Sequence, residues 1–345
     1  RSAQPQGSAQ PDGLLMRVAI VGAGISGLAC AAALRAAGHE PVLFDKARGA
    51  GGRMSTRRID TAQGTIAVDH GATHFTVRSA GFSALVSQWE AEGLAARWPA
   101  AGRDAWIGVP TMNAPLKAYG AEHSIHWSTP VTALTRSPAG WTVHSEARRF
   151  AAFDAAVVAI PAEQAAPLLS LHDFTMARAA MAIRSHPIWS AIFIFARPIG
   201  AATDLIRGDG PITLAMRNGT RPGRRSAECW VVQASWEWSE ANLTRPADQI
   251  CQALLVELAR AAKIFLPQPI HSNAHRWLFG QPSGRDPVDL WNPAIGLGAC
   301  GDWLAHGFVE AAWERGDRLG GHIAASFAAR SELTSEVVRE ARSTG

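Results

Sequence analysis

The sequence contains only three lysines and one tyrosine, and it lacks any long apolar run, although it has 345 residues. The lysines are Lys46, Lys117 and Lys263, and the tyrosine is Tyr119. No apolar stretch approaches the roughly 18 residues of a membrane helix, which argues against a membrane-spanning protein. Chemistry that needs two tyrosines is excluded, and chemistry that needs a lysine is restricted to three positions.

Cysteine is also sparse. Cys30, Cys229, Cys251 and Cys300 lie far apart, with no C-x-x-C pair and no metal-like spacing to histidine. We therefore expect reduced thiols, a cytoplasmic location and no metal site.

The excess of positive charge is small. Basic residues outnumber acidic ones by 33 to 29, which gives a net charge of +4. The arginines are scattered, and no block of five or six basic residues occurs. The sequence therefore predicts no nucleic-acid partner, and its charge favours an anionic small molecule.

The stretch "RVAIVGAGISGLACAAALRAAGHEPVLFD" contains an apolar strand, a glycine turn, an Ala/Leu-rich helix and a second strand. Gly22, Gly24 and Gly27 occupy the three positions of the dinucleotide fingerprint. The first permits a tight turn, the second lets a pyrophosphate approach the backbone, and the third lets helix and strand pack closely. Asp45 follows about 20 residues later, where an acid that binds ribose hydroxyls is expected. The segment predicts a βαβ unit that binds ADP.

The next stretch, "DKARGAGGRMS", distinguishes FAD from NAD. Arg48 and Arg53 flank a glycine-rich loop directly after the ribose acid. This arrangement resembles the RxGGR motif of FAD enzymes in the amine-oxidase class, in which the arginines and loop backbone hold the pyrophosphate and the ribityl chain. The resemblance implies FAD.

A C-terminal segment agrees with this interpretation. "CGDW" followed by "GFVEAAWERG" resembles the flavin motif of the same class, with Asp302 on a ribityl hydroxyl. Val309 and Glu310 then begin a helix whose positive end faces the flavin. A second interpretation makes Asp302 a helix cap, and the two roles are compatible.

Between these motifs the sequence changes character. We expect a helix over 79–93 and a strand over 155–160. "HPIWSAIFIFARPI", "ECWVVQASWEW" and "SNAHRWLFG" are typical of aromatic-rich strands, and Ile250, Leu254, Leu255 and Leu258 share one helical face. The C-terminal strand and helix are expected to rejoin the first domain.

The predicted fold is α/β, with a Rossmann-like FAD-binding domain of amine-oxidase and glutathione-reductase type and a second, mixed α+β substrate domain. We expect the following division: 1–15, a disordered leader or a non-native extension; 16–79, 125–165 and 286–330, the FAD-binding domain; 80–124 and 166–285, the substrate domain; 331–345, a C-terminal tail.

Four segments are similar, in order, to those of the bacterial renalase-like flavoproteins: "VGAGISGLACAAALRAAGHEPVLFDKARGAGGRMSTRR", "DHGATHF", "HRWLF" and "CGDWLAHGFVEAAW". The resemblance runs from Met16 to about Ala325 and is weaker from Ala95 to Ala227. It implies noncovalent FAD and oxidation of the 2- and 6-dihydro isomers of NAD(P) to NAD(P)+, with dioxygen reduced to hydrogen peroxide. Where the family has a Gln-Tyr pair, this sequence has Thr73 and His74.

These motifs and the resemblance together give the expected cofactor contacts. They are Gly22, Gly24, Ile25, Ser26, Gly27, Phe44, Asp45, Lys46, Arg48, Gly52, Arg53, Met54, Gly71, Ala72, Thr73, His74, Val131, Gly301, Asp302, Val309 and Glu310. Cys300 does not match the cysteine motif of covalently flavinylated amine oxidases, so we expect no covalent bond to the flavin.

The missing lysine and tyrosines bear on the reaction. Amine oxidases of this class resemble one another in a lysine near the flavin, and many have a two-tyrosine cage for the amine. Hydride loss from a dihydronicotinamide gives an aromatic pyridinium directly, so no general base is required. Orientation and stacking of the ring suffice. The sequence favours a dihydropyridine donor over an amine.

Two segments are candidates for substrate binding. "WIGVPTMNAP" offers Gly108, Thr111 and Asn113, although an ordinary glycine-proline loop is an equal interpretation. In "HRW", alternation puts His275 and Trp277 on one strand face and Arg276 on the other. Trp189 is a further candidate, and core packing is the alternative for both tryptophans.

Three functions stay open at this point. An FAD-dependent dihydro-NAD(P) oxidase that uses dioxygen comes first, a C–N oxidase acting on amines second, and an FAD-binding redox sensor without turnover third. The aromatic second domain is typical of a substrate pocket, which weighs against the sensor. The oligomeric state is not indicated by the sequence.

Overall fold

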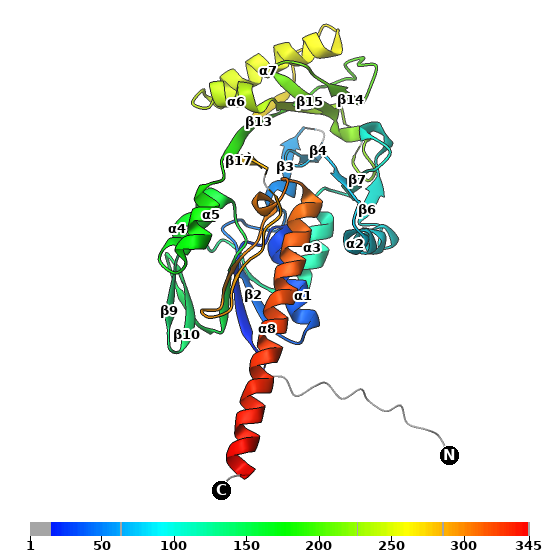
Figure 1. Ribbon diagram of the computed structural model, residues 1–345. Helices are drawn as coiled ribbons and strands as arrows, with labels where there is room; N and C mark the ends of the chain where they lie inside the picture. Colours follow the sequence, from blue (N-terminus) through cyan, green and yellow to red (C-terminus); the bar gives the residue numbers. More distant parts are fainter. Residues whose placement is uncertain (1–14, 63, 226, 285, 344–345) are drawn as a thin grey trace, which may run out of the picture.

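The computed structural model describes residues 15–62, 64–225, 227–284 and 286–343, with side chains as far as Arg330. Figure 1 shows two bodies: the lower contains β2 (Glu40–Phe44), α1 (Ile25–Ala36) and α8 (Val309–Ser343), and the upper contains β13 (Ser185–Ile194) and β17 (His271–Pro282) beneath α7 (Ala247–Ala262). Apart from Leu15, the predicted leader lies outside the described residues. Within these residues, no helix combines the length and apolar character needed to cross a bilayer.

The lower body is built on a six-stranded sheet in which β18 alone runs antiparallel to its neighbour. Both faces of the central strand β1 are covered, so its residues are apolar without alternation. In spatial order the strands are β18 (Leu290–Asn292), β19 (Leu297–Ala299), β12 (Ala155–Val158), β1 (Arg17–Val21), β2 (Glu40–Phe44) and β8 (Ser124–His126). The C-terminal strands thus return to the first sheet, as predicted.

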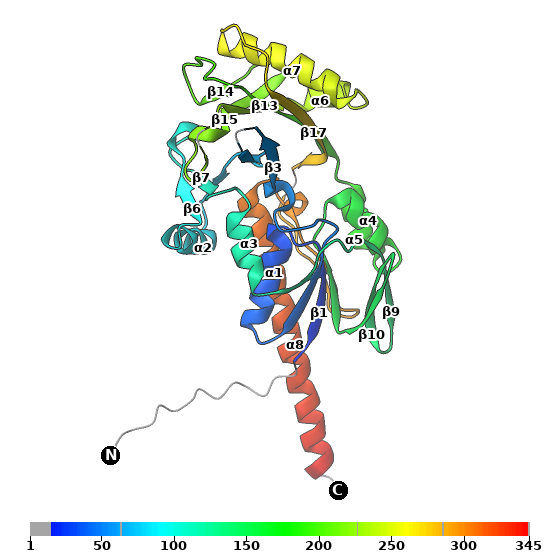
Figure 2. The same ribbon diagram turned by 180° about the vertical axis from the view of Figure 1, so that it is seen from behind.

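Helix α8 (Val309–Ser343) packs along α1 (Ile25–Ala36), because glycines let the two backbones approach closely. A side chain on Gly316 would collide with the Ser26 backbone, and one on Gly320 would meet the Cys30 carbonyl oxygen at 2.7 Å. The long helix projects beyond the sheet in Figure 2. The helix continues over 331–343, within the stretch predicted as a C-terminal tail.

The upper body contains a five-stranded antiparallel sheet with α7 (Ala247–Ala262) on its outer face. Trp189, Phe193, Ile250 and Leu254 are buried together there. In spatial order the strands are β14 (Leu205–Arg207), β15 (Ile212–Arg217), β16 (Cys229–Ala234), β13 (Ser185–Ile194) and β17 (His271–Pro282). Alternation along β13 turns Ile188, Ser190 and Ile192 to the inner face.

One predicted strand is too long. "ECWVVQASWEW" forms a strand only as far as Ala234, and Trp236–Ala241 is helix α6. Ser235 causes the change, because its hydroxyl accepts a hydrogen bond from the Trp238 amide and caps the helix. Trp236 is thereby displaced from the sheet to its edge.

The remaining elements are smaller. A hairpin is formed by β3 (Thr56–Thr61) and β4 (Gly64–Asp69). One three-stranded sheet contains β5 (Phe75–Thr76), β7 (Ala105–Gly108) and β6 (Ala95–Arg97). The other contains β11 (Arg149–Phe153), β10 (Gly140–Ser145) and β9 (Val131–Ser137). The remaining helices are α2 (Ala80–Ala91), α3 (Ala114–Ala121), α4 (Ala162–Ser170) and α5 (Phe174–Met181).

The packing of α4 and α5 bears on the predicted domain division. Leu168, Leu169 and Met176 lie in one apolar core with Val158 of the first sheet. A boundary at residue 166 would separate residues that share this core. The two-domain division itself stays a prediction.

Candidate functional site

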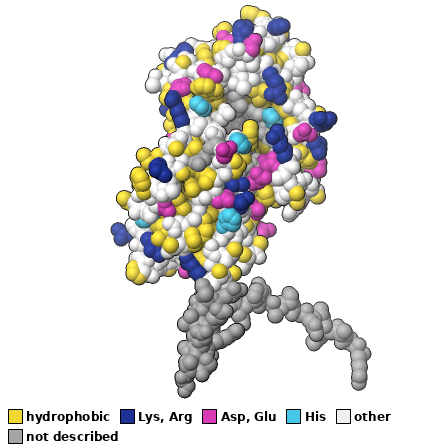
Figure 3. Space-filling model, viewed as in Figure 1, with side chains coloured by type: hydrophobic (Ala, Val, Ile, Leu, Met, Phe, Trp, Pro, Cys, Tyr) yellow, Lys and Arg dark blue, Asp and Glu magenta, His cyan; other side chains and the backbone are white. Residues whose placement is uncertain are grey.

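A cavity of about 1620 Å³ lies between the two bodies, larger than the pockets that hold most small ligands. Its lining comes from the glycine turn after β1, the loop after β2, the segment after β4, the start of α8 and the inner face of the upper sheet. On the face in Figure 3, basic side chains lie singly or in small groups among acidic and apolar ones.

The glycine turn at the first end of this cavity fits a dinucleotide. Gly22 has φ +108°, and a side chain at Gly27 would collide with the Gly22 carbonyl oxygen, so both positions require glycine. A Cβ atom built on Gly24 would have no other heavy atom within 4 Å. Gly24 lines the cavity, so a side chain there would occupy space in it. The N-terminus of α1 behind this turn has no side-chain cap, which leaves its amides for a phosphate.

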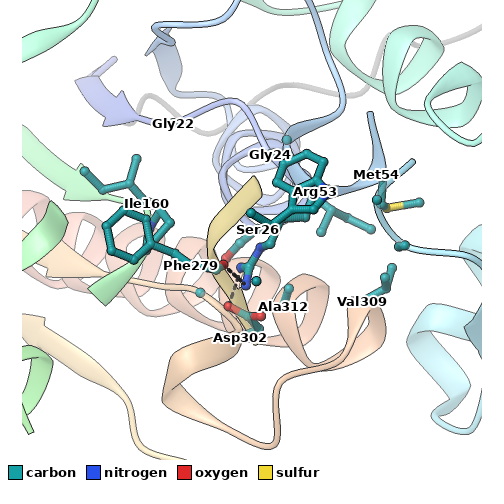
Figure 4. Close-up of a pocket in the computed structure, with 18 of the residues that line it drawn as sticks. Gly22, Gly24, Ser26, Arg53, Met54, Ile160, Phe279, Asp302, Val309 and Ala312 are labelled. Atoms are coloured by element: carbon teal, nitrogen blue, oxygen red, sulfur yellow. Dashed lines mark hydrogen bonds and ion pairs between the residues drawn. The ribbon is translucent and has the colours of Figure 1, made fainter. Parts of the chain in front are cut away.

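The second glycine loop lies directly against the first. A side chain on Gly52, where φ is +50°, would lie 3.6 Å from the Gly24 Cα. Figure 4 shows Gly24, Ser26 and Arg53 side by side at this point. The two loops thus form a narrow cradle of backbone and one cation, which suits a pyrophosphate.

Asp45 connects these loops. Its Oδ2 accepts a hydrogen bond from the Ala23 amide at 2.7 Å, and its Oδ1 accepts one from the Ala47 amide at 2.7 Å. Each carboxylate oxygen keeps a further lone pair, and Asp45 lines the cavity. The carboxylate therefore holds the cradle in shape and also faces the position expected for a ribose.

Arg53 forms an ion pair with Asp302 at 2.6 Å. The same guanidinium also donates to the Phe279 carbonyl at 3.5 Å, and Figure 4 draws both contacts. The two sequence motifs predicted to hold opposite parts of FAD therefore meet directly.

The segment after β4 closes one side of the cavity. A side chain on Gly71 would collide with the Arg53 carbonyl and touch the Trp277 ring at 3.3 Å, so only glycine fits. The Ala72 amide donates to the Arg53 carbonyl at 2.8 Å. The hydroxyl of Thr73 and Nδ1 of His74 lie 2.9 Å apart.

The start of α8 lines the cavity through Val309 and Glu310. Glu310 is buried, and its Oε1 accepts hydrogen bonds from the Arg78 amide at 2.8 Å and the Ser79 amide at 2.6 Å. Its carboxylate therefore anchors the approach to α2.

All but two of the expected FAD contacts line the cavity. Gly27 lies behind the turn, where it lets helix and strand pack. Arg48 is exposed on the outer side of its loop. Contact of the lining residues with FAD stays a prediction.

The upper sheet closes the other end of the cavity. Gln233, His275 and Trp277 line it, and the rings of His275 and Trp277 lie 4.5 Å apart on one strand face, as predicted. Gln233 Nε2 donates to the Gly71 carbonyl at 2.6 Å. Trp277 Nε1 donates to the His70 carbonyl at 3.0 Å. These bonds fix the sheet against the segment after β4.

Two histidines meet at this end, His70 and His275, with ring centroids 5.1 Å apart. Burial lowers the pKa of His70 to about 4, and His275 and the Arg57 cation add to the effect. Burial and then Arg57 also lower the pKa of His275. Both rings are therefore neutral near pH 7.

The loop predicted to touch substrate does not reach the cavity. Gly108, Thr111 and Asn113 are absent from its lining. Asn113 is buried and donates through Nδ2 to the Ala50 carbonyl at 3.0 Å, and the Thr111 hydroxyl donates to Asn113 Oδ1 at 2.9 Å. The loop supports the glycine cradle from behind, and contact of these three residues with substrate stays a prediction.

Trp189 is likewise a core residue. It is 4% exposed and packs under α7, with its Nε1 donating to the Asn242 carbonyl at 3.1 Å. Arg276, its strand partner, is exposed at the edge of the cavity and lies over the Trp189 ring.

A buried ionic cluster beside the cavity was not predicted from the sequence. Asp69 is paired with Arg221 at 2.8 Å and with Arg224, and all three side chains are at most 1% exposed. Arg221 also donates to the Thr73 carbonyl at 2.5 Å. Although burial raises the pKa of Asp69, the two arginines hold it below its ordinary value. The only sequence signal is an acid directly after an apolar strand.

Sequence reasoning also missed several lining residues that come from different elements. They are His70, Ile160, Ile188, Gln233, Phe279 and Phe308. All of these except Ile160 lie in segments quoted above. Alternation along the β16 and β17 sequences is the signal that could have identified Gln233 and Phe279.

Comparison with known families agrees with this geometry. The model of the NAD(P)-binding Rossmann-like domain matches residues 20–89, and that of flavin containing amine oxidoreductases matches residues 94–319. The chain belongs to the flavin containing amine oxidoreductase family. It is a flavin-dependent oxidoreductase with an α/β, Rossmann-like fold, and FAD is its cofactor.

Individual relatives are more distant. The chain is 51% identical to a 4,4'-diapophytoene desaturase of Staphylococcus haemolyticus over 45 residues, which are 13% of the chain and 9% of the desaturase. A proposed protoporphyrinogen oxidase from Exiguobacterium sp. 255-15 has a TM-score of 0.70 at 11% identity, over 90% of this chain and 98% of that one. Putrescine oxidase with bound putrescine has a TM-score of 0.67 at 16% identity, over 90% and 99%. These likenesses show the fold alone.

Proposed function

We propose that the protein oxidises the 2- and 6-dihydro isomers of NAD(P) to NAD(P)+. Bound FAD supplies the two-electron acceptor, which takes hydride at N5 and is reoxidised by dioxygen. Overall, the dihydropyridine, one proton and dioxygen give the pyridinium and hydrogen peroxide. The dinucleotide substrate and dioxygen are the expected partners.

The observation that carries the proposal is the chemistry of the cavity end at the upper sheet. Its lining there consists of Ile188, Thr213, Gln233, Ala234, Trp236 and residues 275–281. Among these described residues there is one arginine and no carboxylate or lysine. An ammonium substrate would find no anion, whereas a neutral aromatic ring would find rings to stack on.

The positions of the lysines support the same conclusion. Lys46 lies at the nucleotide end of the cavity, whereas Lys117 on α3 and Lys263 after α7 are outside its lining. None is placed to assist at the upper sheet. A donor that loses hydride without a proton needs no such group.

Each residue of the sheet end then has a limited role. His275 and Trp277 orient a flat ring, and Gln233 holds the sheet to Gly71. His70 and Phe279 narrow the space around it. Exclusion of water follows from the aromatic and aliphatic lining, and no side chain has to move a proton.

Amine oxidation is the alternative, and the fold shared with putrescine oxidase permits it. An oxygen electrode separates the two. We expect oxygen uptake and stoichiometric hydrogen peroxide with 2- or 6-dihydro-NAD(P), and none above background with putrescine or cyclohexylamine. Uptake with an amine and none with either isomer would favour amine oxidation.

A further inference from the structure

A row of three polar side chains crosses the inner face of the upper sheet. In the strand register, Ser190 of β13 pairs with Gln233 of β16 on one side and with His275 of β17 on the other. Directly paired residues of antiparallel strands project from the same face. Gln233 and His275 line the cavity, and Ser190 lies between them, completely buried and outside the lining.

The surroundings of the row are apolar. Ile188 and Ile192 flank Ser190 along β13, and Trp277 and Val231 lie on the neighbouring strands. Asn273, which also lies on β17, is engaged by Arg57. A few polar groups in an apolar wall fix the orientation of a ligand.

The hydrogen-bonding state of His275 is set by Arg57, whose Nη2 lies 3.5 Å from Nδ1 of His275. A guanidinium can only donate, so Nδ1 is the acceptor and the proton resides on Nε2. The charged or titratable groups that face this ring are Arg57 from β3 and His70 from the segment after β4. His275 therefore offers one N–H donor to the cavity.

Gln233 offers the complementary group. Its Nε2 donates to the Gly71 carbonyl, and its Oε1 remains as an acceptor. Between the two, Ser190 is completely buried, and its Oγ has no hydrogen-bond partner among the described residues. A buried hydroxyl without a partner is uncommon and indicates a group that the ligand or a water supplies.

We propose that the Gln233–Ser190–His275 row is a subsite for a primary carboxamide. The amide oxygen accepts from His275 Nε2, and the amide nitrogen donates to Gln233 Oε1, with Ser190 beneath. The backbones of Gln233 and His275 are two strand spacings apart, about 10 Å. From the His275 donor through an amide to the Gln233 acceptor, two hydrogen bonds span roughly 8 Å. This deepens the proposed function, on which it rests, because the carboxamide is the polar substituent of the nicotinamide ring.

The test compares benzamide with acetophenone, in which a methyl group replaces the amide nitrogen, by calorimetric titration of the FAD-loaded protein. We expect benzamide to bind at least tenfold more tightly. His275→Phe and Gln233→Leu should lose this preference, whereas His275→Gln, which keeps an N–H donor, should retain most of it. Gln281→Leu is the matched control, since Gln281 lines the same cavity outside the row.

Equal binding of the two probes, binding of neither, or a preference that survives in both apolar variants would overturn the subsite. FAD content of each variant checks that it has folded. If benzamide is preferred but neither dihydro-NAD isomer is oxidised, the proposed function fails and the subsite stands. If the isomers are oxidised without any benzamide preference, only the subsite fails.

Discussion

Arg53 and Asp302 are 249 residues apart in the chain and form an ion pair of 2.6 Å at the centre of the cavity. Arg53 comes from the loop after β2 and Asp302 from the turn before α8, so the pair joins both ends of the sequence. Asp302 is 8% exposed at its side chain and Arg53 33%. The predicted FAD site is thus complete only when the C-terminal segment has returned to the first sheet.

Breaking this pair should weaken both fold and cofactor binding. We expect Asp302→Asn or Arg53→Met to lower the free energy of unfolding by about 1–3 kcal/mol, since the remaining charge is left partly buried. The double variant should lose less than the sum of the single losses. Urea unfolding of the four FAD-free proteins measures this coupling, and strictly additive losses would contradict it.

Asp45→Ala should reduce FAD affinity more than it slows reduction of the FAD-saturated protein. Loss of contacts to a charged acceptor costs on the order of 1.5–3 kcal/mol, about tenfold to a hundredfold in affinity. Quenching of flavin fluorescence on binding gives the dissociation constant. Asp60→Ala, an exposed acid on β3, is the control. Unchanged FAD affinity in Asp45→Ala would remove Asp45 from the site.

Stability should fall as the pH drops from about 6.5 to 4, partly because of His70. Its folded-state pKa of about 4 is below the unfolded value of 6.5, so the unfolded chain binds the extra proton in that window. The stability that goes with neutral His70 is complete above the unfolded-state pKa of 6.5 and is lost as the pH falls from there through the folded-state pKa of about 4. From pH 7 to 5 the loss is about 2 kcal/mol. His70→Gln should lack this component in urea unfolding at the two pH values, and an identical pH dependence would contradict it.

Flavin reduction by a dihydronicotinamide should vary little between about pH 6 and 9, because no side chain must first give up a proton. His275 is the ring most able to impose a pH dependence, and its lowered pKa keeps it neutral over most of this range. Anaerobic stopped-flow at saturating donor measures the limiting rate. A tenfold rise with an apparent pKa in this window, abolished in His275→Gln, would reveal a base.

The nucleotide end of the site is predictable from sequence because it is local. Gly22, Gly24 and Gly27 act within one turn, and the acid follows on the next strand, so spacing alone places them. Arg48 shows the limit, since the motif gives its position in the loop but not the direction of its side chain.

The substrate end depends on strand register and long-range contacts. Ser190, Gln233 and His275 form a row only because β13 pairs with strands on both sides. Trp189 is buried in the core under α7, whereas its neighbour Ile188 lines the cavity, because α7 covers only one face of the sheet. No local pattern in the sequence specifies either fact.

The most direct test of the central claim is anaerobic titration of the yellow protein with 6-dihydro-NAD, followed by putrescine in a parallel sample. The account predicts that one equivalent of 6-dihydro-NAD bleaches the flavin and yields one equivalent of NAD+, whereas putrescine in excess leaves the flavin spectrum unchanged. Bleaching by putrescine, with no reduction by 6-dihydro-NAD or 2-dihydro-NAD, would contradict the account.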